Sequence, residues 1–278
     1  MKKHSYRLSV IFLTLLICAF SAFSSAASTA ETSAAVQTTE AEIGQNTAAA
    51  PADTGSNEQT RSQGPDDPSG FVLITDVIPE AILEVRYYSE YNFVGSRIDG
   101  YEEPVILITR EAAAALRKAA DELKHMGYRF RIFDGYRPQM AVDHFVRWAQ
   151  DPQDTKMKKY FYPEIDKELL FSQGYIAKQS GHSRGSTLDL TIFDDATGKD
   201  LDMGGPFDYF GKLSHPSYTD TLTKEQISNR MLLRNVMVSA GFRPLREEWW
   251  HFTLENEPYP ETYFTFPVNS QPVTHDFF

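Results

Sequence analysis

The chain has 278 residues, of which 41% are hydrophobic and 23% charged, and its formal net charge is −11 at pH 7. Such an acidic surface excludes electrostatic attraction to nucleic acid, and no basic amphipathic stretch indicates binding to lipid. Cys18 is the only cysteine. An intramolecular disulfide is therefore excluded, and any metal site must use histidine and carboxylate ligands.

The N-terminus has the three parts of an export signal. Lys2, Lys3 and Arg7 precede an apolar run from Leu8 to Phe23, which small residues follow. Residues 1–27 are therefore predicted to be a signal peptide, which would place the protein in the periplasm, in the cell envelope or outside the cell. An uncleaved anchor is the alternative. We expect no stable membrane insertion after cleavage, and the apolar run would span only about 24 Å as a helix, less than the ~30 Å hydrocarbon core.

Residues 28–70 have the composition of a disordered spacer. They contain no aromatic residue, and Val36 and Ile43 are their only large aliphatic residues. Such a segment cannot bury enough apolar surface to offset the entropy lost on ordering. Residues 71–278 remain, and they are long enough for a single domain with its own hydrophobic core.

The first elements of this domain are two predicted strands and a long helix. Residues 71–78 and 82–88 are rich in β-branched and aromatic residues, which favours strands. Residues 109–126 predict a helix with Thr109 as N-cap, and Gly127 ends it. An apolar stripe indicates the buried face of this helix, formed by Leu116, Ala119, Ala120 and Leu123.

The later elements alternate irregularly between helix and strand. In chain order we expect a strand over 128–133, a turn over 134–138, a helix from Pro138 to Gln150, a helical stretch around 153–173, a strand over 187–193, a helix over 223–240 and further strand within 242–254. No regular alternation of strand and helix emerges. The sequence therefore predicts an α+β fold with a mainly antiparallel sheet flanked by helices.

Two segments hold most of the potential metal ligands. The first runs from Ser180 to Asp189 and places His182 in a loop rich in Gly and Ser, before a predicted strand that contains Asp189. The second ends at His251 and includes Glu248. Zinc in a hydrolase typically has three protein ligands from histidine and carboxylate, plus a water. His182, Asp189 and His251 can be these ligands, and Glu248 can be the base that accepts the proton of the water.

Spacing alone leaves other interpretations open. His182 could be a polar loop residue, and His251 could be a partly buried strand residue. Asp189 is harder to explain without a cation, because an aspartate among apolar strand residues is costly to bury. We expect the remaining histidines to be surface or hydrogen-bonded residues: His125, His144, His215 and His275.

The segment from Ser180 to Asp189 resembles the S-x-H-x-x-G-x-x-x-D signature of the zinc peptidase family that includes VanX-type D-alanyl-D-alanine dipeptidases and D,D-carboxypeptidases. Glu248 to His251 resembles the second signature of that family, E-x-x-H with a tryptophan before the histidine. Residues 134–138 (DGYRP) resemble the turn that carries its transition-state arginine.

Other segments resemble the VanX-type branch in particular, namely residues 86–87, 92–95, 203–204, 207–208, 214–215 and 257–260. The likeness runs from about Thr75 to Pro267, which is nearly the whole domain. Thr187 departs from the pattern, because the family usually has alanine there. We expect this change to affect packing more than activity.

The resemblance implies a role for each matched residue. His182, Asp189 and His251 would bind one zinc ion per domain. Glu248 would be the general base, because it has the motif's offset of three residues from His251, whereas its neighbour Glu247 would point away in an extended segment. Arg137 would hydrogen-bond the scissile carbonyl oxygen as it becomes an oxyanion, and Asp208 with Ser180 would bind the free ammonium of the substrate.

The predicted function is zinc-dependent hydrolysis of the dipeptide D-alanyl-D-alanine in peptidoglycan turnover. One alternative is a D,D-carboxypeptidase, which shares the metal site but needs an open cleft in place of an ammonium pocket. The other is a wall-binding relative without activity, although such a protein would need neither Glu248 nor Arg137. An exported dipeptidase favours scavenging or wall remodelling over depletion of a cytosolic pool.

Overall fold

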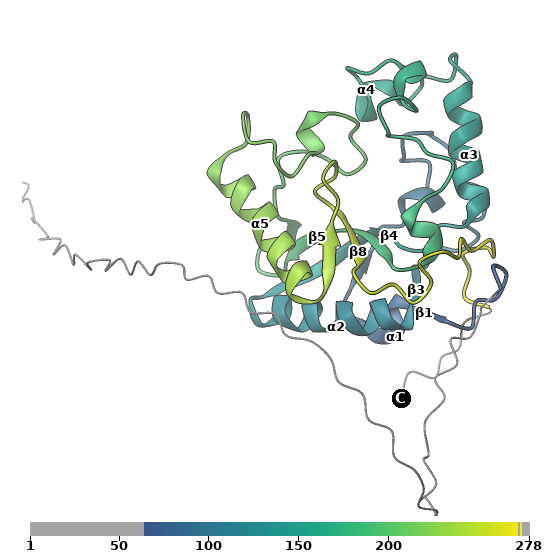
Figure 1. The fold of residues 1–278 in the computed structure, drawn as a ribbon. Coiled ribbons are helices and arrows are strands. Elements are labelled where there is room, and N and C mark those ends of the chain that lie inside the picture. The colour runs from purple at the N-terminus through teal and green to yellow at the C-terminus, as the bar shows by residue number, and fades with distance from the viewer. Residues whose placement is uncertain (1–63, 272, 274–278) are drawn as a thin grey trace, which may run out of the picture. The chain divides into compact units, whose positions relative to one another are not determined.

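The structure, a computed structural model, describes residues 64–271 and residue 273. The predicted signal peptide and residues 28–63 of the predicted spacer lie outside this range, as does His275. Two sheets and five α-helices make up the regular structure of the described residues (Figure 1). None of the helices in this range combines the length and apolar character needed to cross a membrane.

The larger sheet has the order β2-β4-β5-β8-β7, with β6 paired to the end of β5. Its strands are β2 (Ile82–Leu83), β4 (Tyr128–Asp134), β5 (Thr187–Asp194), β6 (Lys199–Asp200), β7 (Phe242–Pro244) and β8 (His251–Leu254). Every pair is antiparallel except β2 with β4. A second sheet pairs β1 (Phe71–Leu73) with β3 (Leu107–Thr109). The prediction of an α+β fold with a mainly antiparallel sheet is confirmed.

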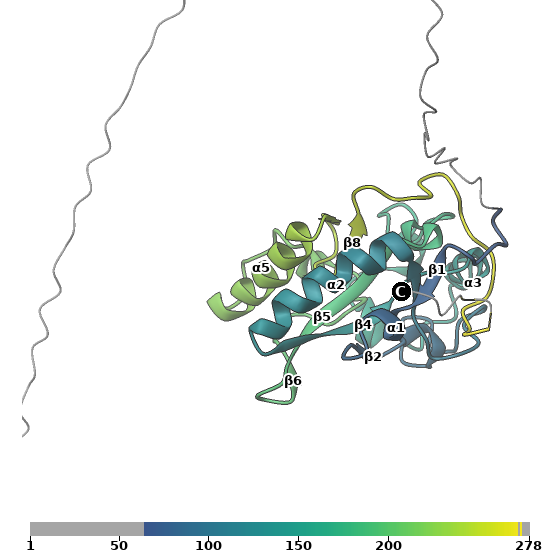
Figure 2. The same cartoon turned by 90° about the horizontal axis from the view of Figure 1, so that it is seen from below.

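Helices flank the larger sheet on both sides. They are α1 (Ile74–Val77), α2 (Arg110–His125), α3 (Gln139–Gln150), α4 (Lys158–Phe161) and α5 (Lys224–Ser239). Seen from below, α2 lies across the sheet beside α5 (Figure 2). The segment containing α3 and α4 stands on the other side of the sheet (Figure 1).

The two long helices begin and end where the sequence predicts. The residues of the apolar stripe of α2 are buried, from Leu116 to Leu123, and Thr109 is the N-cap residue, although its hydroxyl contacts Ser186 instead of capping the helix. Helix α5 begins with a capping box, in which the Thr223 hydroxyl and the Gln226 side chain satisfy each other's backbone N–H groups.

Two predicted strands are wrong over most of their length. Strand β1 ends at Leu73, and α1 follows, because Ile74 and Ile78 both bury completely and a helical turn places residues four apart on the same side. Strand β2 covers Ile82–Leu83 only, and Arg86–Tyr88 form a 3-10 turn.

The helical stretch predicted around residues 153–173 contains only the single turn α4 and a 3-10 turn over Lys167–Leu169. Lys167 explains the irregular path. Its side chain is buried, lies over the ring of Trp148 and donates to the backbone carbonyls of Asp151 and Asp154. The loop therefore folds around a lysine ammonium and not into a continuous helix.

Residues 64–70 hydrogen-bond to the domain. The backbone N–H of Thr265 donates to the Pro65 carbonyl, and that of Arg110 donates to the Gly70 carbonyl. Directly after them, the ring of Phe71 packs against Tyr136, Phe264 and Phe266. The beginning and the end of the described chain are thus joined beneath the turn that follows β4.

Candidate active site

Three side chains form a compact group that can hold a metal ion. Nε2 of His182 lies 3.3 Å from Oδ2 of Asp189 and 3.2 Å from Nδ1 of His251. Nδ1 of His251 lies 3.1 Å from Oδ1 of Asp189. Four-coordinate zinc with bonds of 2.0–2.1 Å has ligand atoms about 3.3 Å apart. Asp189 uses a different carboxylate oxygen toward each histidine, and the triangle with one ligand atom per residue has all three atoms within 4.8 Å of one another. A single metal ion can bind between them.

The polar atoms of this group also need a cation. Both His182 and Asp189 are 2% exposed, and Oδ1 of Asp189 is buried without a hydrogen-bond partner. Burial disfavours the charged form of Asp189, but His182 and His251 outweigh it and hold the pKa of Asp189 well below its usual range. Burial lowers the pKa of His182, so that its ring favours the neutral form that binds metals. The donor set therefore fits a divalent metal.

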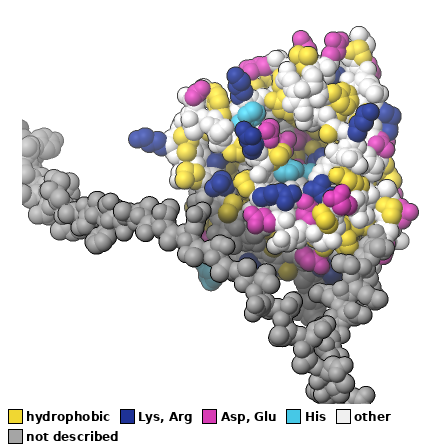
Figure 3. All heavy atoms as spheres, viewed as in Figure 1, with side chains coloured by type: hydrophobic (Ala, Val, Ile, Leu, Met, Phe, Trp, Pro, Cys, Tyr) yellow, Lys and Arg dark blue, Asp and Glu magenta, His cyan; other side chains and the backbone are white. Residues whose placement is uncertain are grey.

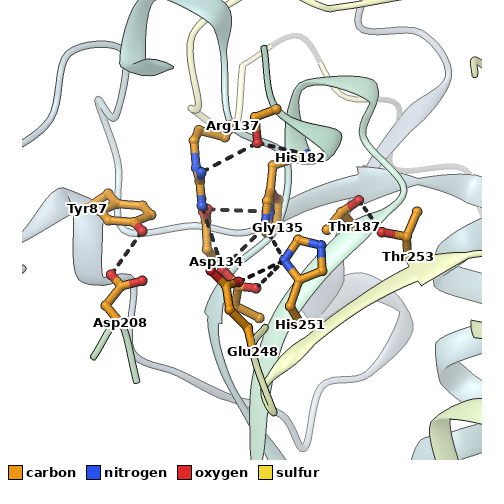
Figure 4. A network of polar contacts seen from close by, with 12 residues as sticks. Tyr87, Asp134, Gly135, Arg137, His182, Thr187, Asp208, Glu248, His251 and Thr253 are labelled. Atoms are coloured by element: carbon orange, nitrogen blue, oxygen red, sulfur yellow. Dashed lines mark hydrogen bonds and ion pairs between the residues drawn. The ribbon is translucent and has the colours of Figure 1, made fainter. Parts of the chain in front are cut away.

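The sheet register brings these ligands together. Asp189 lies directly opposite His251 where β5 pairs with β8. His182 lies in a 3-10 turn over Gly181–Arg184, just before β5, and its Nδ1 is 2.8 Å from the carbonyl oxygen of Gly135. That hydrogen bond directs Nε2 toward the other two ligands, the usual second contact of a metal-binding histidine. Figure 4 shows this convergence.

Glu248 faces the same group, whereas Glu247 does not. Oε2 of Glu248 lies 3.4 Å from Nδ1 of His251, and Glu247 is exposed. The extended segment predicted here is interrupted, because residues 246–247 form a bend and residues 249–250 form a turn. Burial and the nearby carboxylate of Asp189 raise the pKa of Glu248 to about 7, although His251 opposes this shift. A carboxyl group with that pKa can both accept and return a proton near neutral pH.

Arg137 reaches the site from the turn after β4. Its Nε and Nη2 donate to Oδ2 of Asp134 at 2.9 and 2.8 Å, and its guanidinium carbon lies 4.9 Å from the centroid of the Tyr87 ring. Asp134 is fully buried and also accepts from the Tyr101 hydroxyl at 2.7 Å. Arg137 is therefore fixed in place as a hydrogen-bond donor, with Nη2 3.6 Å from Oδ2 of Asp189.

Asp208 lies across the pocket from the histidines. It is 6% exposed, and its Oδ2 accepts from the Tyr87 hydroxyl at 2.9 Å. It is the one non-glycine residue with positive φ among the described residues, at 61°. Aspartate tolerates this left-handed conformation better than most residues with a side chain, but it carries strain, and such residues cluster at functional sites. Ser180 also lines the pocket, and its hydroxyl accepts from the His182 N–H at 3.3 Å.

All seven residues predicted for the site line one pocket of about 430 Å³. This volume is in the range of small-ligand sites. The space-filling view shows a hollow with histidine and acidic side chains in it and Lys and Arg side chains near its border (Figure 3). Aromatic rings form part of its wall, among them Tyr87, Phe145 and Phe210.

Sequence reasoning assigned no role to Asp134, Gly135 or Tyr87, although each holds a site residue in place. Only the DGYRP turn pointed to the first two, since an acid three residues before an arginine can pair with it. His125 is exposed, and His144 accepts from the N–H of Asp99, as expected of residues outside the site. The hydroxyl of Thr187 bonds that of Thr253 at 2.9 Å, which leaves the ligands in position.

Comparisons with known proteins find a matching family and several relatives. The sequence profile of the family described as D-Ala-D-Ala dipeptidase matches residues 67–269. A D-alanyl-D-alanine dipeptidase of Enterococcus faecalis is 41% identical over 201 residues, covering 72% of this chain and 99% of the relative. Proteins of the same name match from Streptomyces coelicolor, with 39% identity over 71% of this chain and 98% of the relative, and from Escherichia coli, with 31% identity over 68% and 86%.

Proposed function

The chain belongs to the D-Ala-D-Ala dipeptidase family of metallopeptidases, and we propose that it hydrolyses D-alanyl-D-alanine to two D-alanines with one zinc ion held by His182, Asp189 and His251. The observation that carries the proposal is the convergence of His182, Asp189 and His251, whose polar atoms approach one another to 3.1–3.3 Å, beside a carboxyl group with a pKa of about 7. When bound, zinc supplies Lewis-acid polarisation of a water molecule and of the substrate carbonyl.

The side chains around the metal ligands supply proton transfer and hydrogen bonding to the substrate. Glu248 takes a proton from the attacking water and passes it to the leaving amine, since it lies beside His251 and titrates near neutral pH. Arg137, held by Asp134, donates a hydrogen bond to the carbonyl oxygen as negative charge develops there. Removing a donor of this kind typically costs about 3–4 kcal/mol of transition-state stabilisation.

The opposite wall selects the length of the substrate. Asp208, with Ser180, binds the ammonium of the first residue, because Asp208 is the buried acid of the pocket that neither ligates the metal nor pairs with an arginine. A longer peptide, with further residues before this one, has an amide in place of the ammonium at this point. Asp208 would then be left without a cation. The site is therefore suited to a free dipeptide.

A panel of four substrates tests the proposal on the zinc-loaded protein. D-Ala-D-Ala should be cleaved, whereas L-Ala-L-Ala, N-acetyl-D-Ala-D-Ala and a peptidoglycan stem pentapeptide should be poor substrates. Equal cleavage of the free and the acetylated dipeptide would contradict the ammonium pocket and favour a D,D-carboxypeptidase. Absence of all four activities would favour a binding protein without catalysis.

We also propose that the protein is exported and acts on D-Ala-D-Ala released during peptidoglycan turnover. The support is the basic start and apolar run of residues 1–27, which lie outside the described residues. N-terminal sequencing of the protein recovered from the cell envelope or the medium tests this proposal. A chain that starts at about Ser28 is expected, and a chain retained in the cytosol with its first residues intact would contradict it.

A further inference from the structure

The pocket has a second charged end, formed by two arginines that share one carboxylate. Nε and Nη2 of Arg184 donate to Glu257 at 2.8 and 2.7 Å, and Nη2 of Arg243 donates to Oε1 of the same residue at 3.0 Å. The Glu257 side chain is only 5% exposed. One anion therefore faces two permanent cations, and a net positive charge remains at this end of the pocket.

The two arginines differ in exposure and in how firmly Glu257 holds each guanidinium. Arg184 is 15% exposed and binds both carboxylate oxygens of Glu257 through two donors, Nε and Nη2, so its geometry is fixed. Arg243 is 49% exposed and contacts Glu257 through Nη2 only, as far as the described residues show. Both residues line the pocket. Arg243 is thus held at the pocket by one hydrogen bond, with its other N–H groups available to a ligand.

This cationic end lies away from Asp208. Arg243 is the partner of Thr253 where β7 pairs with β8, and Thr253 lines the pocket too. In Figure 4, Thr253 and Asp208 appear on opposite sides of the histidines of the proposed metal site. A dipeptide is about 7 Å long when extended, and it is a zwitterion at neutral pH. Such a substrate, lying across the metal with its ammonium at Asp208, directs its carboxylate toward the Arg243 end.

We propose that Arg243 binds the C-terminal carboxylate of the dipeptide, and that Glu257 and Arg184 act as positioning residues that hold its guanidinium at the pocket. This inference rests on the proposed function and adds the residue that selects the free carboxylate. Arg137 cannot bind the substrate's carboxylate in addition to its scissile carbonyl oxygen, because Asp134 fixes the Arg137 guanidinium beside the metal ligands. The anionic wall at Asp208 and the cationic wall at Arg243 then match the two charges of the substrate.

A purely structural role for Arg243 predicts a different effect of its replacement on substrate preference. If its ion pair only secures β7, its loss should lower stability and affect all substrates alike. The experiment therefore compares D-Ala-D-Ala with its C-terminal amide, which lacks the negative charge, in the zinc-loaded full-length chain. The variants are Arg243→Gln and, as a matched control, Arg246→Gln, since Arg246 is an exposed arginine three residues away that does not line the pocket.

For the free dipeptide, kcat/KM should fall about 10- to 100-fold in Arg243→Gln, the usual effect of losing a hydrogen bond to a charged group, and the loss should appear mainly in KM. For the amide, kcat/KM should change by no more than about 3-fold. The preference of the enzyme for the free acid over the amide is therefore largely lost in the variant. Arg246→Gln should keep the parent's preference. Arg184→Ala is a weaker probe, because it leaves the buried Glu257 without its main partner.

Two outcomes would overturn the inference separately from the proposed function. In the first, the parent enzyme cleaves D-Ala-D-Ala and the Arg243→Gln variant keeps the same preference for the free acid. This result would show that Arg243 does not bind the carboxylate. A parallel fall for both substrates, accompanied by a lower Tm, would assign Arg243 a structural role. A zinc-loaded parent inactive on D-Ala-D-Ala would instead remove the proposed function and this inference with it.

Discussion

Asp208 combines a strained backbone with a buried carboxyl group, and both features fit a residue that awaits a cation. Burial and the nearby charge of Asp189 raise the pKa of Asp208 well above its usual value in the metal-free protein, against the opposing effect of Arg137. The neutral acid is therefore favoured until an ammonium arrives. Binding of the substrate should ionise Asp208 and release a proton.

Asp208→Asn should weaken activity and yet stabilise the metal-free protein at higher pH. The folded-state pKa of Asp208 is raised, so its stabilising contribution is fully present below the unfolded pKa of about 3.9 and is lost as pH rises through the folded pKa. Asn keeps the shape and cannot ionise. The Tm difference, variant minus parent, should therefore grow from pH 4 to pH 8. A difference that is constant or shrinks with pH would contradict the raised pKa.

Glu248 and Glu247 are adjacent acids with opposite expectations. Glu248→Ala should fold normally and retain zinc but lose kcat by about 10²- to 10⁴-fold, the usual range for a positioned acid–base group. Glu247→Ala should remain within a few-fold of the parent, because Glu247 is exposed. Zinc content must be measured beside the rate. A zinc-loaded, fully active Glu248→Ala enzyme would contradict the assignment of the base.

The three candidate metal ligands could be predicted from the sequence, whereas some of the side chains that hold the other site residues in place could not. His182, Asp189 and His251 lie in spaced motifs whose residue types determine metal chemistry. Asp134 lies three residues before Arg137, so its spacing offered a signal for that ion pair. Tyr87 holds Asp208, which lies 121 residues away along the chain, and sequence spacing does not contain that contact.

The turn between His182 and β5 depends on Gly185. Its φ is +80°, and an added Cβ would lie 2.2 Å from the ring of Phe71 in β1. Gly185→Ala should therefore displace the aromatic cluster and the metal loop together. Gly127→Ala is the matched control, because Gly127 has φ +84° and no atom within 4 Å of the added Cβ.

Both variants carry the backbone cost of about 1–2 kcal/mol for a left-handed residue with a side chain, but only Gly185→Ala also adds a clash. Thermal unfolding should show a clearly larger fall in Tm for Gly185→Ala than for Gly127→Ala, together with weaker zinc retention. Equal Tm losses would mean that the approach to Phe71 is not tight in solution.

Long helices could be predicted from the sequence because local signals define them. Thr109, Thr223 and the apolar stripe of α2 act within one segment. The segments 71–78 and 153–173 failed because their conformation follows distant contacts. Ile74 and Ile78 both bury in the core, and Lys167 is held by the backbone carbonyls of Asp151 and Asp154, 16 and 13 residues earlier in the chain. Propensity yields to tertiary contacts at such places.

The fold places an acidic wall and a basic wall around one group of candidate metal ligands. The sheet provides Asp189 and His251 on paired strands, and the segment between β5 and α5 provides Asp208. Strand β7, at the end of the strand order, provides Arg243. In the proposed function, the substrate's ammonium, scissile carbonyl and carboxylate would meet separate parts of the chain, and this arrangement would reject longer peptides.

A zinc titration of D-Ala-D-Ala hydrolysis by the full-length chain tests the proposed zinc site. Chelation should abolish kcat/KM, and one equivalent of zinc per chain should restore it. His251→Ala should neither hold that zinc nor recover activity, because it removes one corner of the ligand triangle. Undiminished hydrolysis by the metal-free protein, or full recovery in His251→Ala, would contradict a zinc dipeptidase built on His182, Asp189 and His251.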